Sequence, residues 1–376
     1  MENSNWNSDK LGSVIEIKYG KDHKKLSEGN FPCLGSGGIM RYVDSYLYDD
    51  ESILIPRKGS LNNIMFQDSS FWTVDTMFWS KIDKSKVFPK YLFYQLTLID
   101  YENLNVGSAV PSLTVPVINE IEIQLPPLPE QKAIASVLSS LDDKIDLLHQ
   151  QNQTLEALAE TLFRQWFIEE AKEEWKDCTI GDLANHSKIS VHPNKNPDTL
   201  YHHYSIPAFD ANKKPVVELG KEIQSNKYKV ENNSILFSKL NPHKDKRVWL
   251  IQDSVEENAI CSTELQVVKP KDKDYLYFIY GWLTNSIYYN EIASGVGGTS
   301  GSHQRIEPKA IFTAPCVKIE KDIILQYNSH AEPLFKKQFE NQQQIQTLTQ
   351  LRNTLLPKLM SGAVSLSNCG EVRVKN

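Results

Sequence analysis

The feature that most constrains this chain is an internal repeat, in which a globular segment is followed by a long helix, twice. Residues 150–167, QQNQTLEALAETLFRQWF, align with residues 342–360, QQQIQTLTQLRNTLLPKLM, and each of the two helices follows a Pro-containing extended segment. Two copies are too few for a solenoid. The repeat therefore predicts two globular modules and two long helices that pair antiparallel, related by a pseudo-two-fold.

The first long helix is expected from roughly Glu130 to Glu174, after a Pro-rich start that suits a helix N-terminus. Its apolar residues step by four and three, which is a coiled-coil pattern. The second helix is expected from roughly Asp322 to Met360, with Pro333 inside it. A polar residue in the core of a coiled coil fixes its register, and this is the role predicted for Asn152. The predicted seam comprises Ile134, Leu138, Leu141, Ile145, Leu148, Asn152, Leu155 and Leu162 of the first helix and Leu348 and Leu355 of the second.

The globular segments also match one another. Residues 51–60, ESILIPRKGS, resemble residues 233–242, NSILFSKLNP, and residues 73–82 resemble residues 259–268. These short runs are rich in Ile, Val, Phe and Trp and are bounded by turn residues, which predicts strands. An aromatic-rich helix is expected in each module, from the sequences YLFYQLTLIDYENLN and YLYFIYGWLTNSIYYNEIA. The predicted fold class is α+β.

Composition limits the possible locations and chemistries. No stretch approaches the roughly 20 apolar residues of a membrane span, and the polar first residues lack the pattern of a signal peptide, so a cytoplasmic protein without membrane contact is expected. The five cysteines are odd in number and include no CxxC, which favours reduced, separate thiols. The net charge of -6 counts mildly against DNA binding, although the distribution of charge matters more than its sum.

Motifs of catalysis are missing. The chain has no GxxxxGK[ST] phosphate loop and no Asn-Pro-Pro-aromatic tetrapeptide, and residues 240–243, LNPH, lack the second Pro and the aromatic residue. The glycine cluster at residues 35–38 is interpreted as a turn rather than a cofactor loop. Residues 129–132, PEQK, resemble part of a nuclease motif, but a helix start explains them better. We therefore expect no catalytic residue.

A metal site is imaginable but not predicted. His186, His192, His202 and His203 lie near Cys178 in the sequence, but their spacing does not match known zinc motifs. We expect no metal and no cofactor on this chain.

Two pairs of polar loops are candidates for contact with DNA. One loop of each module follows the matching SILIP and SILFS runs, and the other contains VGSAVPSLT or VGGTSGSHQRI. Arg, Lys and Asn can bond base edges or phosphates, and small residues let a backbone approach closely. Solvated loops and flexible linkers are the alternatives. Tyr46, Tyr48, Tyr201 and Tyr204 suit either a DNA surface or a core. The predicted DNA-binding residues are Arg57, Lys58, Ser60, Asn62, Ser108, Ser112, Lys239, Asn241, Lys244, Lys246, Arg247, Thr299, Ser300, His303 and Arg305.

The two helical repeats carry a resemblance to a known family. Residues 125–167, with LPPLPEQKAIASVL at their start and LFRQWF at their end, resemble the central repeat of type I restriction-modification specificity subunits. Residues 341–362, with LRNTLLPKLMSG, are similar to the C-terminal repeat of that family, and GSAVPSLT resembles the segment before the central repeat.

The resemblance implies a function that composition alone does not suggest. It implies a non-catalytic, sequence-specific subunit that binds double-stranded DNA, two methyltransferase subunits and restriction subunits. Each recognition domain would read one half of a bipartite target, and the helices would set the gap. S-adenosylmethionine, ATP and Mg ions would bind the partners. The implied domains are residues 1–128 and 171–320 for recognition, 129–170 and 321–364 for the conserved helices, and 365–376 for a tail.

Two other functions stay open at this point. A stand-alone DNA methyltransferase or nuclease is disfavoured by the missing motifs. A coiled-coil scaffold without a DNA role is disfavoured only weakly, by the duplicated polar loops.

Overall fold

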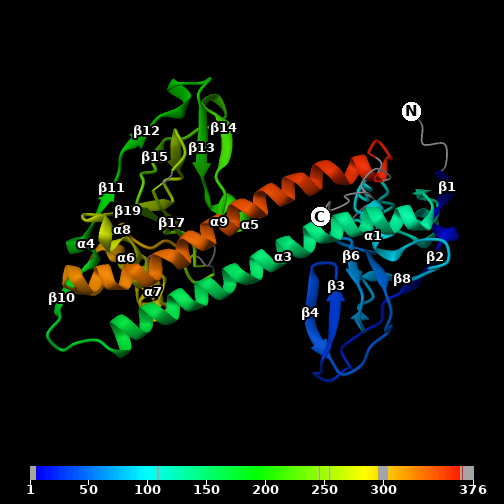
Figure 1. The fold of residues 1–376 in the computed structure, drawn as a ribbon, viewed down its shortest axis with the longest axis horizontal. Coiled ribbons are helices and arrows are strands. Elements are labelled where there is room, and N and C mark those ends of the chain that lie inside the picture. Colours follow the sequence, from blue (N-terminus) through cyan, green and yellow to red (C-terminus); the bar gives the residue numbers. More distant parts are fainter. Residues whose placement is uncertain are drawn as a thin grey trace, which may run out of the picture. The chain divides into compact units, whose positions relative to one another are not determined.

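The computed structural model describes residues 6–107, 110–244, 246–253, 255–294, 304–364 and 366. The chain divides into a first unit, residues 1–148 and 343–376, and a second unit, residues 149–342. This division cuts through the two long helices, α3 (Leu128–Arg164) and α9 (Lys321–Met360), so each unit contains part of both (Figure 1). The predicted domain boundaries at the helix ends stay a prediction.

The first unit contains two sheets and a strand pair. The sheets have the orders β2-β8-β5-β6 and β4-β3-β7, and β1 pairs with β9. The central strand β5 is buried along its whole length, as its continuous apolar run requires. The elements are β1 (Asn7–Lys10), η1 (Leu11–Ser13), β2 (Ile15–Tyr19), β3 (Phe31–Gly35), β4 (Gly38–Val43), β5 (Ser52–Pro56), β6 (Met65–Gln67), β7 (Trp72–Thr73), β8 (Met77–Ile82), α1 (Pro89–Leu96), α2 (Val115–Asn119) and β9 (Glu122–Leu125).

The second unit has the same plan with insertions. Its sheets have the orders β11-β19-β16-β17 and β12-β15-β18-β13-β14, and β10 pairs with β20. The elements are η2 (Gln165–Glu169), β10 (Lys176–Thr179), α4 (Ile180–Leu183), β11 (Ala184–Ser187), β12 (Ser190–Val191), η3 (Pro193–Lys195), β13 (Leu200–Tyr204), α5 (Ile206–Asn212), β14 (Val216–Leu219), η4 (Gly220–Glu222), β15 (Lys227–Lys229), β16 (Ser234–Ser238), β17 (Val248–Ile251), β18 (Ala259–Cys261), β19 (Leu265–Pro270), η5 (Lys273–Tyr275), α6 (Leu276–Thr284), α7 (Ser286–Ser294), α8 (Pro308–Thr313) and β20 (Pro315–Lys318).

Strand pairing confirms the internal repeat and the α+β class. In the first unit β3 runs parallel to β7, and in the second β13 runs parallel to β18, at the same place in the chain order. The register of the strands shows that one of the predicted sequence matches is shifted. Leu54 lies opposite Trp79 and Leu236 lies opposite Val267, so β8 and β19 align two residues away from the match of residues 73–82 with 259–268. Alternation of similar apolar residues made both alignments plausible, because a shift of two keeps each side chain on its face.

In the first unit the parts of α3 and α9 pack antiparallel. Ile145 and Leu148 are buried against Ile345, and the guanidinium of Arg352 lies 2.9 Å from a carboxylate oxygen of Asp142. Ile134 and Leu138 belong to the core of this unit together with residues of the end of α9, and Leu355 packs against that core. Leu141 is half-buried, and Leu348 packs against the Ile145 cluster.

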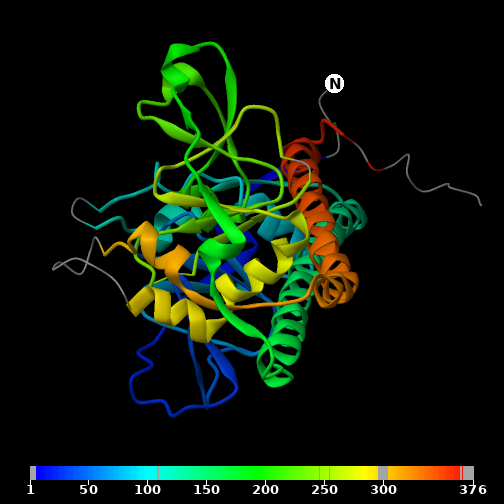
Figure 2. The same cartoon turned by 90° about the vertical axis from the view of Figure 1, so that its left-hand side faces the viewer.

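In the second unit the two helix parts also run antiparallel. Phe163 and Phe167 pack on Tyr327. Helices α6 and α7 contribute to the same core, and their ribbons lie beside the start of α9 (Figures 1 and 2). The polar seam residue Asn152 has a buried partner, since the amide of Asn341 donates to its Oδ1 at 3.0 Å. Leu155 is half-buried, and Leu162 packs against the core of the unit.

Three helices differ from their expected lengths. Helix α1 ends at Leu96 and does not continue through the rest of the expected segment, residues 91–105. Helix α3 ends at Arg164 and passes into a π-helical turn, Gln165–Glu169, instead of continuing to Glu174. The expected aromatic helix of the second module is two helices, α6 and α7. The break lies at Asn285, whose backbone is extended and whose Oδ1 accepts from the backbone of Ile287 at 3.0 Å. This is the side-chain capping by which Asn starts a new helix.

The four described cysteines, Cys33, Cys178, Cys261 and Cys316, are free thiols, as predicted. Two of them are neighbours, since Cys178 and Cys316 lie opposite each other in the β10–β20 pair with their Sγ atoms 3.2 Å apart. Cys369 lies outside the described residues. Within the described part of the chain, no helix is long and apolar enough to cross a membrane.

Candidate nucleic-acid interface

In the first unit the two candidate loops lie side by side. The backbone N–H of Leu113 donates to the carbonyl of Arg57 at 3.0 Å, and the N–H of Gly59 donates to the carbonyl of Pro111 at 3.3 Å. Lys58 and Ser112 form a β-bridge between these bonds. We call residues 57–59 with residues 111–113 the first junction. Loops that are far apart in the sequence thus meet in one surface.

The second unit repeats this arrangement. The N–H of Ile306 donates to the carbonyl of Lys239 at 2.8 Å, and the N–H of Asn241 donates to the carbonyl of Gln304 at 2.9 Å. Leu240 and Arg305 form the β-bridge between them. Residues 239–241 with residues 304–306 are the second junction. Its backbone pattern matches that of the first junction.

The matching positions Gly59 and Asn241 also share a backbone conformation. Gly59 has a φ of 91° and Asn241 has a φ of 47°, both in the region that Gly and Asn tolerate. Each junction is tied to the neighbouring strand at the same place. The N–H of Arg57 donates to the carbonyl of Thr76 at 2.8 Å, and the N–H of Lys239 donates to that of Glu264 at 3.0 Å.

The side chains of the first junction have few acidic partners. Arg57 donates to the carbonyl of Asp75 at 3.2 Å, and its guanidinium lies 5.4 Å from the ring centroid of Tyr19. Lys58 and Ser60 are exposed. Asn62 has a structural contact, since its Oδ1 accepts from the backbone of Tyr101 at 2.9 Å.

Carboxylates hold several cations of the second unit. Arg305 makes two bonds to Glu264, at 3.2 and 3.1 Å, and Lys239 lies 3.7 Å from the same carboxylate. Arg247 makes two bonds to Asp210 of α5, at 2.6 and 2.8 Å. The sequence could not reveal these carboxylates as partners, because they come from segments distant along the chain.

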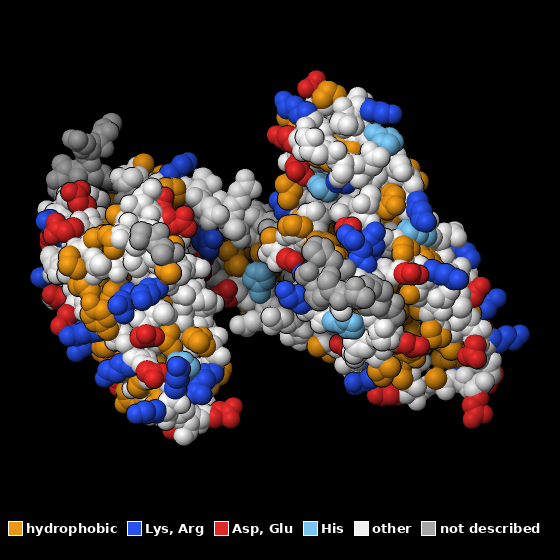
Figure 3. Space-filling view, turned by 180° about the vertical axis from the view of Figure 1, so that it is seen from behind, with side chains coloured by type: hydrophobic (Ala, Val, Ile, Leu, Met, Phe, Trp, Pro, Cys, Tyr) orange, Lys and Arg blue, Asp and Glu red, His pale blue; other side chains and the backbone are white. Residues whose placement is uncertain are grey.

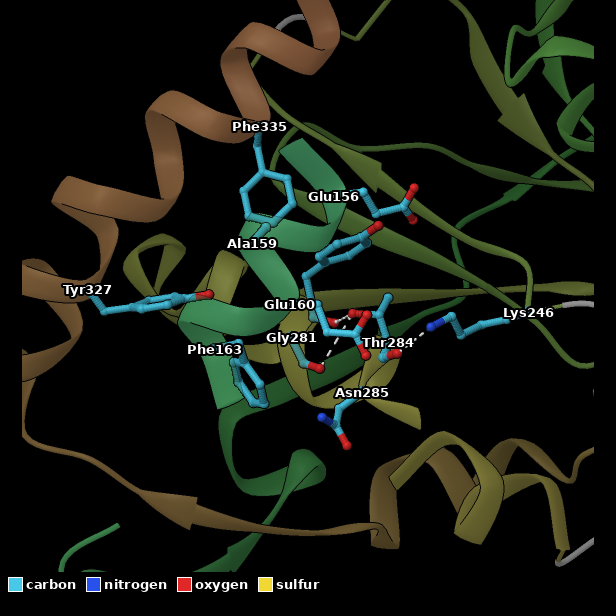
Figure 4. Close-up of a pocket in the computed structure, with 11 residues that line it drawn as sticks. Glu156, Ala159, Glu160, Phe163, Lys246, Gly281, Thr284, Asn285, Tyr327 and Phe335 are labelled. Carbon is cyan, nitrogen blue, oxygen red and sulfur yellow. Dashed lines mark hydrogen bonds between the residues drawn. The ribbon is translucent and has the colours of Figure 1, made fainter. Parts of the chain in front are cut away.

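Two predicted lysines of this unit differ in their surroundings. Lys244 is exposed. Lys246 donates to the carbonyl of Thr284 at the end of α6, at 2.6 Å, beside a small cavity (Figure 4). Glu156 and Glu160 of α3 also line this cavity, whose volume is about 30 Å³. That space suits a water molecule rather than a ligand.

Four predicted residues, Ser108, Thr299, Ser300 and His303, lie outside the described residues.

The glycine turn at residues 35–38 is a neighbour of the first junction that the sequence did not predict. The Nδ2 of Asn63 donates to the carbonyl of Ser36 at 2.7 Å, and a hollow of about 600 Å³ is lined by Ser36, Asp75 and Thr76 among others. A turn of small residues has no signal of its own for such a role. Only the pairing of strands β3 and β4 places it there.

Two candidate tyrosines and two histidines of the second unit pack inside it. Tyr201 and Tyr204 are buried. Burial lowers the pKa of His186 to about 4. Its ring stacks on that of Phe312, with 5.2 Å between the two ring centroids. Burial also lowers the pKa of His203, whose Nδ1 lies 2.6 Å from Glu218. Among the described residues, no group of three or more His, Cys, Asp and Glu is placed to hold a metal ion.

In the first unit Tyr48 packs against a core cluster and Tyr46 is largely exposed. On the face in Figure 3, basic and acidic side chains are intermixed over both units, as the acidic sequence leads one to expect.

Comparisons with known proteins agree with this architecture. Residues 3–157 match the model of the type I restriction modification DNA specificity domain. The MjaIX specificity subunit of Methanocaldococcus jannaschii is 29% identical over 325 residues, which are 77% of this chain and 72% of that protein. The MjaVIII specificity subunit of the same organism is 31% identical over 197 residues, 47% of this chain and 46% of that protein.

A solved structure has the same fold. The type I restriction-modification S subunit from M. genitalium matches with a TM-score of 0.68 at 16% identity, covering 96% of this chain and 97% of that one.

These matches place a DNA specificity domain of the type I restriction-modification kind at residues 3–157 of this chain. Over 77% of its length, the chain is similar to a specificity subunit of a type I restriction enzyme. Such subunits are non-catalytic components of their complexes, which confirms the prediction that this chain is not an enzyme.

Proposed function

We propose that this chain gives a type I restriction-modification complex its DNA sequence specificity, with each unit reading one half of a bipartite target in double-stranded DNA. The duplicated junction is the observation that carries this proposal. Its backbone bonds recur in both units, while the side chains change from Arg57 and Lys58 to Lys239 and Leu240. One framework with two sets of side chains suits two different half-sites.

The chemistry of the junctions fits double-stranded DNA. Lys58 and Lys244 are exposed, and Arg305 has half of its side chain accessible. Arg and Lys bind phosphates and the acceptor edge of guanine, and hydroxyl side chains such as that of Ser112 bind either. Ser108, Thr299, Ser300 and His303 remain part of this proposed surface.

Methylome sequencing tests the proposal. The chain is co-expressed with its methyltransferase subunit in a host that lacks other modification of this kind. One split motif is the expected result. Methylation without a split motif, or no DNA shift by a complex that assembles, would overturn the proposal and favour a scaffold.

A domain exchange tests the assignment of one half-site to each unit. Residues 171–320 are replaced by the corresponding segment of another specificity subunit. We expect one half of the motif to change and the other half to stay. A change in both halves would contradict independent reading.

We further propose that the long helices set the spacing between half-sites and dock the partner subunits. A helix of 37 residues, such as α3, spans about 55 Å at ~1.5 Å per residue. Apolar side chains on these helices remain exposed, namely Leu147 and Leu351 in the first unit and Leu158 and Phe339 in the second. Contiguous exposed apolar side chains mark interaction surfaces, and these four residues are the candidates for such surfaces on the helices. Two methyltransferase subunits would dock there, and the restriction subunits would join that assembly.

Replacing Leu158 by Glu tests the docking. The methyltransferase should bind more weakly, while the isolated chain keeps its unfolding temperature, because this side chain is half exposed. Glu156→Gln, two residues away on the same helix, is the control. Unchanged assembly with Leu158→Glu would contradict the docking proposal.

S-adenosylmethionine, ATP and Mg ions are proposed to bind the partner subunits, in the cytoplasm. Isothermal titration of the purified chain with S-adenosylmethionine should give no heat of binding, whereas the assembled methyltransferase should bind it. Clear binding by the chain alone would contradict this assignment.

A further inference from the structure

The second junction contains a carboxylate that the first lacks. Glu264 and Thr76 occupy matching positions, since their carbonyls accept from Lys239 and Arg57. Likewise Arg305 stands where the first junction has Ser112. A pair of one acid and one cation has thus replaced two hydroxyl residues at the same two places of the framework.

The geometry of this pair is that of a fixed guanidinium. Glu264 accepts from Nε and Nη2 of Arg305, which is the side-on, two-bond arrangement. The side chain of Glu264 is 27% exposed and that of Arg305 is 51% exposed. The acid therefore lies on the inner side of the pair and the arginine on the outer side.

A guanidinium has five N–H donors, and the two bonds to Glu264 use only two of them. The remaining donors are the two N–H groups of Nη1 and the second N–H group of Nη2. One N–H group of each of these nitrogens lies along the edge of the guanidinium that faces away from Glu264. Two parallel donors on one edge match O6 and N7 of guanine. A side chain held in advance loses less rotational freedom on binding than a free one.

Lys239 contributes to the same cluster without such a fork. Its ammonium is 3.7 Å from Glu264 and its side chain is 20% exposed. The carboxylate thus offsets part of the charge of two cations, which lowers the sequence-independent attraction of this junction for phosphates. A weaker sequence-independent attraction to DNA makes the contacts with bases a larger part of the binding free energy, which favours discrimination between bases.

We propose that Glu264 is a positioning residue, which holds Arg305 so that the free edge of its guanidinium reads a guanine in the half-site of the second unit. This inference rests on the proposed function, because it requires that the second unit contacts DNA bases. In the first unit Ser112 and Thr76 cannot form this pair. The effect is therefore confined to one half of the target.

Three variants test the proposal in the assembled methyltransferase complex. Glu264→Gln keeps the shape of the side chain and removes its charge. Arg305→Lys keeps the positive charge and loses the fork. Glu257→Gln is the matched control, because Glu257 is an exposed carboxylate of the same unit outside the junction.

The readouts are the methylome and the affinity for DNA duplexes at several salt concentrations. For Arg305→Lys we expect discrimination at one G·C position of one half-site to fall by about 10-fold or more. Glu264→Gln should relax the same position, while affinity for unrelated DNA rises and depends more steeply on salt. Glu257→Gln should keep the wild-type motif.

Other outcomes overturn the inference. If Arg305→Lys keeps the full motif, the arginine contacts phosphate or nothing, and the guanine reading is wrong. If Glu264→Gln weakens all sequences equally and lowers the unfolding temperature, the residue is structural. Should Glu264→Gln fail to fold, Arg305→Lys still decides, since this side chain is half exposed. If the wild-type complex shows no split motif, the proposed function itself fails.

Discussion

The two units share a backbone framework and differ in the side chains and additional elements that this framework carries. In the first unit the junction has Arg57 over the ring of Tyr19 and an exposed Lys58. In the second, Glu264 and Asp210 hold the cations, and α5 and the β12–β15 strand pair are additional elements. The comparison teaches that backbone hydrogen bonds and positive-φ positions define the module, whereas its side chains and insertions are free to diverge.

The largest expected effect concerns the helices, which both units use. Leu148 is 1% exposed and its neighbour Leu147 is 46% exposed. Leu148→Asp should cost several kcal/mol, because it buries an unpaired charge in the seam. Leu147→Asp, next to it, should leave stability within about 0.5 kcal/mol of wild type. Urea denaturation followed by circular dichroism measures both, and equal losses would show that the seam is assigned wrongly.

The next effect distinguishes the polar seam of the second unit from the apolar seam of the first. Asn341→Leu removes the partner of Asn152, and leaving that amide oxygen unpaired should cost about 1–3 kcal/mol. In the double variant Asn152→Leu, Asn341→Leu, much of this loss should return. A double-mutant cycle in urea measures the coupling; strictly additive losses would mean that the two amides do not interact.

A pH effect is expected in the second unit. Its folded state holds His186 with a pKa of about 4, below the ordinary value of 6.5, so the unfolded chain takes up the proton first. Stability is then complete above about pH 6.5 and falls as the pH drops toward 4. In the first unit the matching residue is Ile17, which pairs with Ser80 as His186 pairs with Val268.

His186→Ile should therefore remove part of this pH dependence. The change in unfolding temperature between pH 7 and pH 5 should shrink by about 3 °C, measured by scanning calorimetry. His149→Ile, at an exposed position of the same unit, is the control. Identical slopes in the wild type and in His186→Ile would refute this assignment.

The smallest effect is on salt dependence. Lys58→Ala in the first unit and Lys244→Ala in the second should each lower the slope of log affinity against log salt by about 1, with the motif unchanged. Both side chains are exposed, so neither change should affect folding. An altered motif would make them base readers rather than phosphate contacts.

The sequence predicted the repeat, the long helices and the mixed modules because heptads and matched apolar runs are local signals. It also placed the candidate loops at equivalent positions. It could not pair the loops with each other, since the bonds from Leu113 to Arg57 and from Ile306 to Lys239 depend on the folded chain. For the same reason the partners Glu264, Asp210 and Asn341 were missed. Small shifts, such as the end of α3 at Arg164, follow from capping and packing rather than from periodicity.

Strands β1 and β9 pair along their length, as do β10 and β20, so the chain enters and leaves each globular region at nearly the same point. Each region is therefore a closed loop whose two ends meet at one strand pair, and beyond that pair it packs on the long helices. The entropy of closing a loop grows only with the logarithm of its length. A region with insertions can thus replace a shorter one at little cost. Genetic recombination at these two strand pairs would exchange a whole region while leaving the helices intact, and under the proposed function it would change one half-site in a single event.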